Sequence, residues 1–306
     1  MQIAICIAML GIAVEPMPDG QAAIRAKAGA SEIVVTTTSR LSGAIHSLTW
    51  NGKEFIDSLD HGRQMQSASS FDCAKPGPFW AECYNPTEAG SRKDGAGKTS
   101  TSRLLKIEAT DNFLRTTSQS AFWLAPREKS EGRDALNDRV VSAHRVSKKV
   151  TIGRKNHPHV IEYDVTFHVP EGEKHTYAQF EAVTGYMPAE FSTFWKYLPN
   201  EKKLAAIEPG QGEQQYPVIL ATADGKYAMG IYSPDQPSKG FENAGYGRFR
   251  FEKEKVVKWN SVFRYRDAAG IKPGDYSFRN FVFVGTLDDV TKSMTAIVDE
   301  YAKNDK

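Results

Sequence analysis

The chain has 306 residues, of which 40% are hydrophobic and 25% are charged, a composition typical of a globular protein in water. Its formal net charge of +2 provides no strong attraction to nucleic acid or to a membrane surface, so we predict neither as a partner. The length allows one large all-β domain or two ordinary ones.

An apolar run from Ile3 to Val14 opens the chain. It has the length of the hydrophobic part of a signal peptide and is too short to span a bilayer. No Lys or Arg precedes it, and a buried N-terminal strand is the alternative. We predict a signal peptide or strand over 1–22, a single domain over 23–306, and a secreted or periplasmic location.

Residues 31–57 combine β-branched runs with turn dipeptides, which predicts three strands, the last two joined by an Asn51-Gly52 turn. Later in the chain, Tyr163, Val165 and Phe167 alternate with polar residues, as expected of a strand with one buried face. The further strand candidates are residues 103–110, 113–125, 139–153, 159–169, 177–187, 217–223, 227–233, 246–254, 256–266 and 276–285.

One helix is predicted, over residues 287–303, with Thr286 as its N-cap. Its apolar residues recur at helical spacing, so we expect it to lie against a sheet. More than ten strands with a single helix predict an all-β antiparallel sandwich or barrel.

The segment GAIHSLTWNGKEFID, residues 43–57, carries Gly-x-Ile-x-Ser-Leu on a strand that leads through Asn-Gly into a second strand. It resembles the opening of galactose-mutarotase-like domains. The resemblance implies an antiparallel β-supersandwich that binds a sugar on a concave sheet face, as in aldose epimerases, glycoside hydrolases and polysaccharide lyases.

The stretch from Asp60 to Arg103 shows neither helical nor strand periodicity and is rich in polar and aromatic residues. Loops longer than about 12 to 15 residues are usually functional or disordered, and disordered segments contain few aromatic residues. We therefore predict an ordered loop that forms one wall of a sugar-binding site.

The start of this loop holds a candidate general base, His61, whose neighbour Asp60 would tune its charge. Arg63 and Gln64 are candidate substrate-binding residues. The alternative is a structural His61 beside an Asp60–Arg63 surface pair.

Glu82, Tyr84, Asn85 and Glu88 follow within seven positions. Two carboxylates are what glycosidic hydrolysis requires. Elimination at a uronic acid would instead use His61 as base and Tyr84 as acid, with Arg63 or Asn85 neutralising the sugar carboxylate. The alternative is a loop whose polar groups satisfy its own turns.

Trp80 and Trp195 are candidates for stacking on a sugar ring, although each is also a plausible core residue. Arg92 and Arg103 make the second half of the loop basic, which suits an acidic saccharide or a solvated surface equally. Glu181 is a secondary catalytic candidate, and His144 is a candidate for the concave site.

Cofactors are not predicted. Residues 95–99 imitate a phosphate-binding loop, but Arg92 stands where that pattern requires its first glycine. His157 and His159 have metal-ligand spacing on a strand, but Pro158 favours a turn or an edge, and no third ligand is evident. Cys73 and Cys83 form a disulfide in an oxidising compartment or remain free thiols.

These features predict a secreted carbohydrate-active enzyme that cleaves a glycan by acid/base chemistry, as a glycoside hydrolase or a polysaccharide lyase. The alternatives are an aldose 1-epimerase-like enzyme and a non-catalytic carbohydrate-binding module.

Overall fold

The computed structural model describes residues 17–236, 238 and 245–304. The predicted signal segment from Ile3 to Val14 lies outside the described residues. Within those residues, no helix combines the length and apolar composition that a membrane crossing requires.

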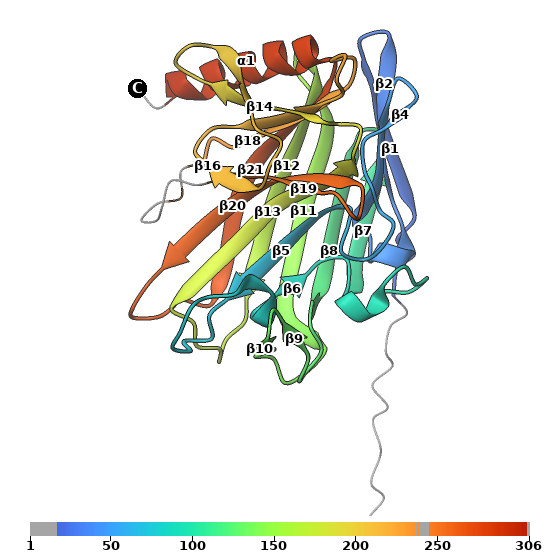
Figure 1. Cartoon of the computed structure of the whole chain (residues 1–306). Coiled ribbons are helices and arrows are strands. Elements are labelled where there is room, and N and C mark those ends of the chain that lie inside the picture. Colours follow the sequence, from blue (N-terminus) through green and yellow to red (C-terminus); the bar gives the residue numbers. More distant parts are fainter. Residues whose placement is uncertain (1–16, 237, 239–244, 305–306) are drawn as a thin grey trace, which may run out of the picture.

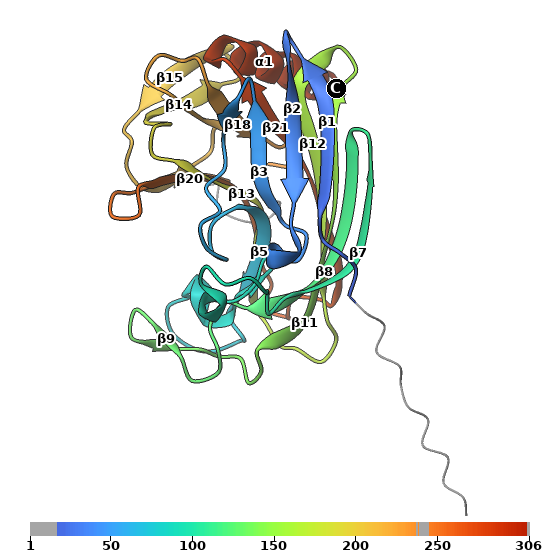
Figure 2. The ribbon, with the colours of Figure 1, turned by 90° about the vertical axis from the view of Figure 1, so that its right-hand side faces the viewer.

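The strands pair antiparallel in two runs, which Figures 1 and 2 show from two sides. The first run, in spatial order, is β1 (Ala22–Ala28), β2 (Ser31–Thr37), β3 (Ile45–Trp50), β5 (Met65–Phe71), β13 (Tyr177–Pro188), β20 (Val256–Arg266), β19 (Tyr246–Phe251) and β16 (Gly212–Gln214). The second run is β7 (Arg103–Thr110), β8 (Phe113–Phe122), β11 (Val141–Arg154), β12 (His157–Val169), β21 (Gly274–Gly285), β18 (Ala228–Tyr232), β17 (Val218–Ala221), β14 (Thr193–Leu198) and β15 (Lys203–Ile207).

Short elements complete the sandwich. The strand β6 (Pro86–Thr87) pairs with both β5 and β8 and so joins the two runs. The strand β4 (Lys53–Glu54) pairs with β3, and β9 (Lys129–Ser130) forms a separate hairpin with β10 (Arg133–Asp134). Three short 3₁₀ helices are η1 (Ser39–Leu41), η2 (Ala81–Tyr84) and η3 (Arg92–Asp94). The predicted all-β class with a C-terminal helix is confirmed.

The main core lies between the two runs, and the alternation in β12 shows how the sequence builds it. Tyr163, Val165 and Phe167 are buried in the main apolar cluster. The polar residues between them, such as Asp164 and Thr166, are more exposed. Because successive side chains of a strand point to opposite faces, this pattern places one face of β12 in the core.

The helix α1 (Leu287–Asn304) crosses one end of the sandwich, opposite the β9–β10 hairpin (Figure 1). Asp289 donates its backbone N–H to Thr286 Oγ1 at 3.1 Å, and Thr286 N–H donates to Asp289 Oδ2 at 3.2 Å. These reciprocal bonds form a capping box, which confirms the predicted N-cap. Val290, Met294 and Ile297 are fully buried in a second apolar cluster with residues of β12, β17 and β21.

The Asn51-Gly52 turn between β3 and β4 is also confirmed. Trp50 pairs with Lys53 across it. Asn51 and Gly52 have φ values of 49° and 73°, the left-handed conformation that a type I′ hairpin turn requires at both positions.

The stretch from Asp60 to Arg103 differs from the prediction, because it is not one continuous loop. Met65–Phe71 is the strand β5, buried at all seven positions, and it lies between β3 and β13. Its sequence, MQSASSF, shows no alternation because small polar residues occupy both faces. The irregular wall is therefore shorter than predicted, from Asp72 to Ser102.

Both described cysteines are free thiols, so the unpaired alternative holds. Burial, together with the negative charges of Glu173 and Asp72, raises the pKa of Cys73 to about 12. Burial also raises the pKa of Cys83.

Candidate functional site: a cleft over β5, β13 and β20

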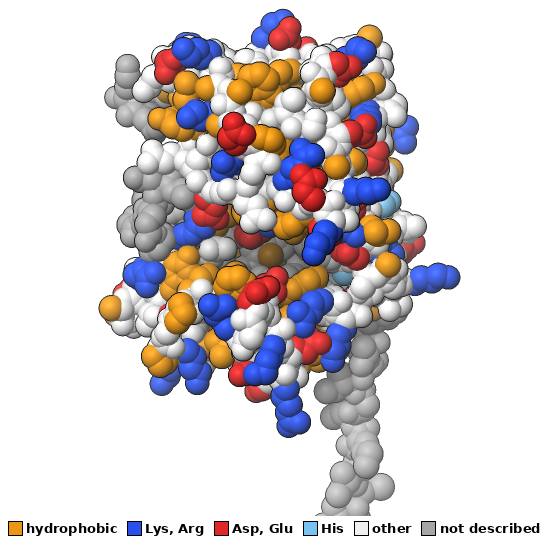
Figure 3. Space-filling model, in the orientation of Figure 1, with side chains coloured by type: hydrophobic (Ala, Val, Ile, Leu, Met, Phe, Trp, Pro, Cys, Tyr) orange, Lys and Arg blue, Asp and Glu red, His pale blue; other side chains and the backbone are white. Residues whose placement is uncertain are grey.

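A cleft of about 420 Å³ opens on the face of the first run of strands that points toward the viewer in Figure 1. Figure 3 shows the hollow in the middle of this face, with acidic and basic side chains at its margins. Gln66, Ala68 and Ser70 of β5 line the cleft, at alternate positions of one strand face. The volume falls in the range of small-molecule sites.

A β-bulge in β13 determines which of its side chains enter the cleft. The register shifts between Glu181 and Val183 in the pairing with β20, and between Glu181 and Thr184 in the pairing with β5. Glu181, Thr184 and Tyr186 all line the cleft, although a regular strand would point residues 181 and 184 to opposite faces. The extra residue therefore aims Glu181 into the cleft, a use of bulges that is common beside active sites.

Glu181 forms the central ion pair of the cleft with Lys258 of β20. Lys258 Nζ donates to Glu181 Oε2 at 3.3 Å, and Thr184 Oγ1 donates to the same oxygen at 2.7 Å. Burial alone would raise the pKa of Glu181, but the positive charge of Lys258 and these hydrogen bonds lower it below its ordinary value. Glu181 is therefore ionised at neutral pH and suited to act as a base or a nucleophile.

Tyr186 faces the same cation. It pairs directly with Lys258 across β13 and β20, and Lys258 Nζ lies 5.2 Å from the centre of its ring. Burial raises the pKa of Tyr186, so its hydroxyl remains protonated and can donate a hydrogen bond. The ring of Phe251 stacks on it at 6.3 Å between centroids and extends the apolar part of the cleft.

A second part of the cleft wall comes from the turn that precedes β5. Arg63 Nη2 lies 3.0 Å from Asp60 Oδ2, and Arg63 Nη1 lies 3.7 Å from Asp57 Oδ1. The indole of Trp123, which follows β8, packs beside Gly62, where an added Cβ would approach Trp123 Cη2 to 2.8 Å. The turn thus presents a fixed arginine next to an aromatic ring.

The helix η2 forms the third wall and carries Glu82 and Asn85 at or beside its end. Ser130 Oγ donates to Glu82 Oε2 at 2.5 Å and accepts from Trp80 Nε1 at 3.0 Å. The β9–β10 hairpin therefore fixes the carboxylate of Glu82. Asn85 Nδ2 donates to Ser69 O at 2.7 Å, which fastens the wall to β5.

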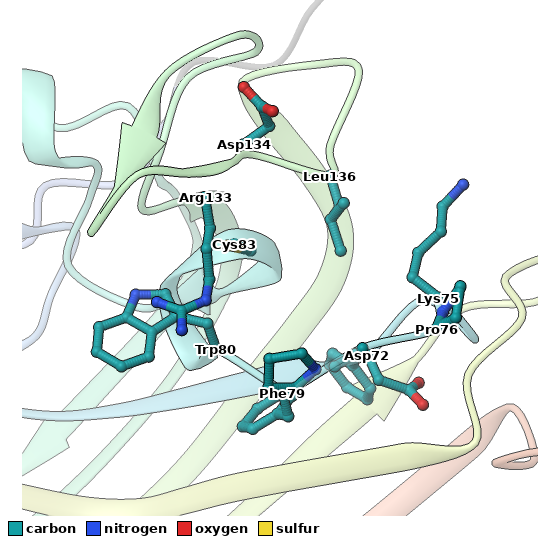
Figure 4. Close-up of a pocket in the computed structure, with 12 residues that line it drawn as sticks. Asp72, Lys75, Pro76, Phe79, Trp80, Cys83, Arg133, Asp134 and Leu136 are labelled. Atoms are coloured by element: carbon teal, nitrogen blue, oxygen red, sulfur yellow. The ribbon is translucent and has the colours of Figure 1, made fainter.

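Trp80 lies on the other side of η2, in a second hollow of about 310 Å³ (Figure 4). The Arg133 guanidinium carbon lies 4.7 Å from the centre of the Trp80 ring, and Phe79 lies beside them. The predicted aromatic residue is thus adjacent to the main cleft, although it does not line it.

Of the residues predicted from the sequence, Arg63, Glu82, Asn85 and Glu181 meet in the main cleft. The other predicted residues lie elsewhere, for reasons that differ from case to case.

His61 is fully buried between two backbone carbonyls. Its Nδ1 lies 2.7 Å from Gly95 O, and its Nε2 lies 2.9 Å from Arg40 O. Because both ring nitrogens face protein oxygens, neither is available to take a proton from a substrate. Gln64 is also fully buried and donates its side-chain amide to His61 O at 2.9 Å.

Glu88 forms a buried ion pair with Lys148 of β11 and accepts from Ser67 N–H at 3.1 Å. This carboxylate joins the two runs of strands and does not reach the cleft. Tyr84 and His144 lie in a separate buried cluster around Glu173.

The remaining predicted substrate-binding residues, Arg92, Arg103 and Trp195, also lie away from the cleft. Arg92 contacts Glu128 at 3.5 Å on the surface, and Arg103 is exposed at the start of β7. Trp195 of β14 packs against the cluster beneath α1. None of these three residues lines the cleft.

Four further residues line the cleft that were not predicted from the sequence: Lys258, Tyr186, Thr184 and Trp123. A lysine between Val257 and Trp259 inside an apolar strand was a usable signal, because a cation there requires a partner. The bulge that brings Thr184 beside Glu181 depends on strand pairing and leaves no comparable local signal.

Among the charged residues that line the cleft, four are acidic and two are basic: Asp60, Glu82, Glu181, Glu254, Arg63 and Lys258. This balance favours a neutral ligand over an anionic one. Arg92 and Arg103, which suggested an acidic saccharide, do not line this cleft, whereas Arg63 and Asn85 do.

Comparison with known proteins identifies the class of fold. No family model matches the chain, and no curated protein matches it. Among solved structures, a glycosyl hydrolase family 38 protein from Enterococcus faecalis matches with a TM-score of 0.50 and 9% identity, over 90% of this chain and 32% of that one. The Slr1438 protein of Synechocystis sp. PCC 6803 matches with a TM-score of 0.47 and 9% identity, over 89% and 99%. A GH36 α-galactosidase from Geobacillus stearothermophilus matches with a TM-score of 0.44 and 8% identity, over 89% and 42%.

At these identities the likeness concerns the fold alone. The chain corresponds to about a third of the length of the family 38 protein and to less than half of the α-galactosidase. It is an all-β sandwich with an open cleft over β5, β13 and β20.

Proposed function

We propose that the protein binds a neutral saccharide in the cleft over β5, β13 and β20 and cleaves a glycosidic bond by acid/base chemistry. The observation that carries this proposal is the ionised Glu181, held by Lys258 and Thr184 in a cleft that also contains an aromatic ring and a second carboxylate. The fold shared with a part of a glycosyl hydrolase family 38 protein supports a saccharide as the ligand.

The binding part of the proposal depends on the mixture of groups in the cleft. Trp123 and Phe251 provide apolar faces for the C–H side of a sugar ring. Arg63, Asn85 and Tyr186 provide polar groups for its hydroxyls.

In the catalytic part of the proposal, Glu181 removes a proton from a water molecule while the water oxygen forms a bond to the anomeric carbon. Glu82, on the wall formed by η2, gives its proton to the glycosidic oxygen as the bond to that oxygen breaks. The products are two shorter saccharides, and Glu82 recovers its proton from Glu181 through solvent. The Ser130 hydroxyl orients Glu82 for this step.

The test is incubation of the full chain with neutral and uronate oligosaccharides, with measurement of reducing ends and of the ultraviolet absorbance of unsaturated products. New reducing ends from neutral sugars, lost in Glu181→Gln and retained in the exposed-surface control Glu108→Gln, are expected. Unsaturated products from uronates would show elimination in place of hydrolysis. Absence of both products would overturn the catalytic proposal.

A second candidate function is saccharide binding without catalysis. It is favoured by the length of the glycosyl hydrolase family 38 protein, because this chain matches only 32% of it. Affinity for an oligosaccharide on a glycan array, unchanged in Glu181→Gln and accompanied by no turnover, would support this function.

A further inference from the structure

A buried cluster of two histidines and a glutamate lies outside the cleft, at the end of the sandwich that carries η2. His144 comes from the start of β11, while Glu173 and His175 come from the connection between β12 and β13. The Nε2 atoms of both histidines lie 2.8 Å from the same oxygen, Glu173 Oε2. The side chains of His144 and His175 are 3% and 2% exposed.

The two imidazole rings are held in place by aromatic packing. The centre of the Phe71 ring lies 4.8 Å from that of His144 and 4.6 Å from that of His175. Tyr84 packs against His175 at 5.3 Å between ring centroids. The neighbouring rings therefore hold both imidazoles so that their Nε2 atoms point toward the Glu173 carboxylate.

A further observation concerns the other nitrogen of His175. Among the described residues, its buried Nδ1 has no hydrogen-bond partner. The ring therefore makes its polar contact only through Nε2, at the point where the three side chains meet.

We propose that His144, Glu173 and His175 bind one divalent transition-metal ion, with Zn²⁺ as the preferred ion. Two imidazoles and one carboxylate form a common zinc ligand set. Their ligand atoms all lie within 4.8 Å of one another. Tetrahedral zinc bonds of about 2.0 to 2.2 Å place ligand atoms about 3.4 Å apart. The widest pair of ligand atoms would therefore close by up to about 1.4 Å, and each Nε2, now 2.8 Å from Glu173 Oε2, would move away from that oxygen by about 0.6 Å.

Metal binding changes the tautomers of the two rings and not their charge. Each neutral imidazole would bind the ion through the Nε2 lone pair, and its proton would move through solvent to Nδ1. Glu173, whose side chain is 21% exposed, gives the ion a route from solvent. Cys73 is not part of the ligand set, because the group whose ligand atoms lie within 4.8 Å of one another consists of His144, Glu173 and His175.

The site would act on the cleft through η2. The ring of Tyr84 packs against that of His175, and the next residue, Asn85, lines the cleft. Bound metal would therefore stabilise the wall that carries Glu82, without touching a substrate. This role is independent of whether the cleft is catalytic.

The test is titration of the full chain with Zn²⁺, produced without a polyhistidine tag and stripped of metal by a chelator. One equivalent is expected to bind, and Co²⁺ in its place should give the visible absorption of a nitrogen- and oxygen-ligated ion. His175→Ala and Glu173→Gln should each weaken binding by more than about 100-fold, beyond the 10- to 100-fold typical of changes around a metal site.

The matched control is His168→Ala. His168 is an exposed histidine with a carboxylate partner at the same distance, 2.8 Å from Asp275 Oδ1, and it should leave Zn²⁺ affinity unchanged. Circular dichroism identifies any variant that fails to fold. If His175→Ala does not fold, the Zn²⁺ affinity of the near-isosteric Glu173→Gln tests the site alone. Absence of one-to-one binding, or equal affinity in Glu173→Gln and the natural chain, would overturn the proposal.

Discussion

Lys258 Nζ lies 3.3 Å from Glu181 Oε2, and the two residues come from the neighbouring strands β20 and β13. Their side chains are 12% and 23% exposed, so water screens the pair only in part. The pair is the main charged feature on the floor of the cleft, and its removal should affect stability and chemistry together.

Lys258→Met should destabilise the protein at neutral pH by about 1 to 3 kcal/mol, because it leaves the Glu181 carboxylate partly buried without its cation. Without Lys258, burial should raise the pKa of Glu181. In the natural chain, the lowered pKa of Glu181 stabilises the fold at pH values above about 4.3, the ordinary pKa of a glutamate. This stabilisation is lost as the pH falls below that value. The difference between the two proteins in urea denaturation should therefore be largest at pH 7 and shrink below about pH 4.

The same substitution tests the proposed role of Glu181 as a base. If a carboxylate with a lowered pKa is required, the acidic limb of the pH–rate profile should move to higher pH in Lys258→Met. The control is Lys106→Met, which removes a lysine from the exposed strand β7. An unchanged acidic limb would show that Glu181 does not limit the reaction.

Glu88→Ala should destabilise the protein by about 3 to 5 kcal/mol, because it leaves Lys148 as an unpaired buried charge. Urea denaturation measures this loss. The double variant Glu88→Leu with Lys148→Met should recover most of it, since replacing both partners of a buried pair by apolar residues is often neutral. A stable but inactive Glu88→Ala variant would instead return Glu88 to the catalytic candidates.

The strands with one apolar face were predictable from the sequence, and those with polar residues on both faces were not. The alternation around Tyr163 identified β12, and Asn51-Gly52 identified the β3–β4 hairpin. The strand β5 was not predicted, because its cleft-facing residues, such as Gln66, are polar and its opposite face contains Ser67 and Ser69. A strand that lines a binding site therefore loses the periodicity by which strands are recognised.

The same reasoning explains how much of the site could be predicted. The sequence placed Glu82 and Asn85 in a functional wall, because loops rich in aromatic and polar residues are usually functional. It also favoured His61, since a histidine beside Asp60 at the end of a predicted strand has the chemistry of a base. The carbonyls that surround His61 belong to Arg40 and Gly95, more than twenty residues away in each case, and only the fold brings them together.

His61→Ala should lower stability by about 1 to 3 kcal/mol, because a buried backbone carbonyl, Gly95 O or Arg40 O, loses the imidazole N–H that it accepts. Saccharide affinity and turnover per folded molecule should be retained. Glu181→Gln provides the contrast, with lost turnover and a smaller effect on stability. Turnover normalised to the folded fraction measures the difference, and a fully folded, inactive His61→Ala protein would restore His61 as the base.

Trp123→Ala should weaken saccharide binding about 5- to 30-fold, the equivalent of losing one stacked sugar face, about 1 to 2 kcal/mol. Gly62→Ala should have a milder effect of the same kind, because the added Cβ would approach Trp123 Cη2 to 2.8 Å and displace the indole. Isothermal titration with the best oligosaccharide of the panel measures both. The control is Trp195→Ala, which removes a tryptophan from the cluster beneath α1 and should lower stability without changing affinity. Because the two tryptophans are chemically identical and differ only in position, an equal loss of affinity in both variants would show that the sugar does not stack on Trp123.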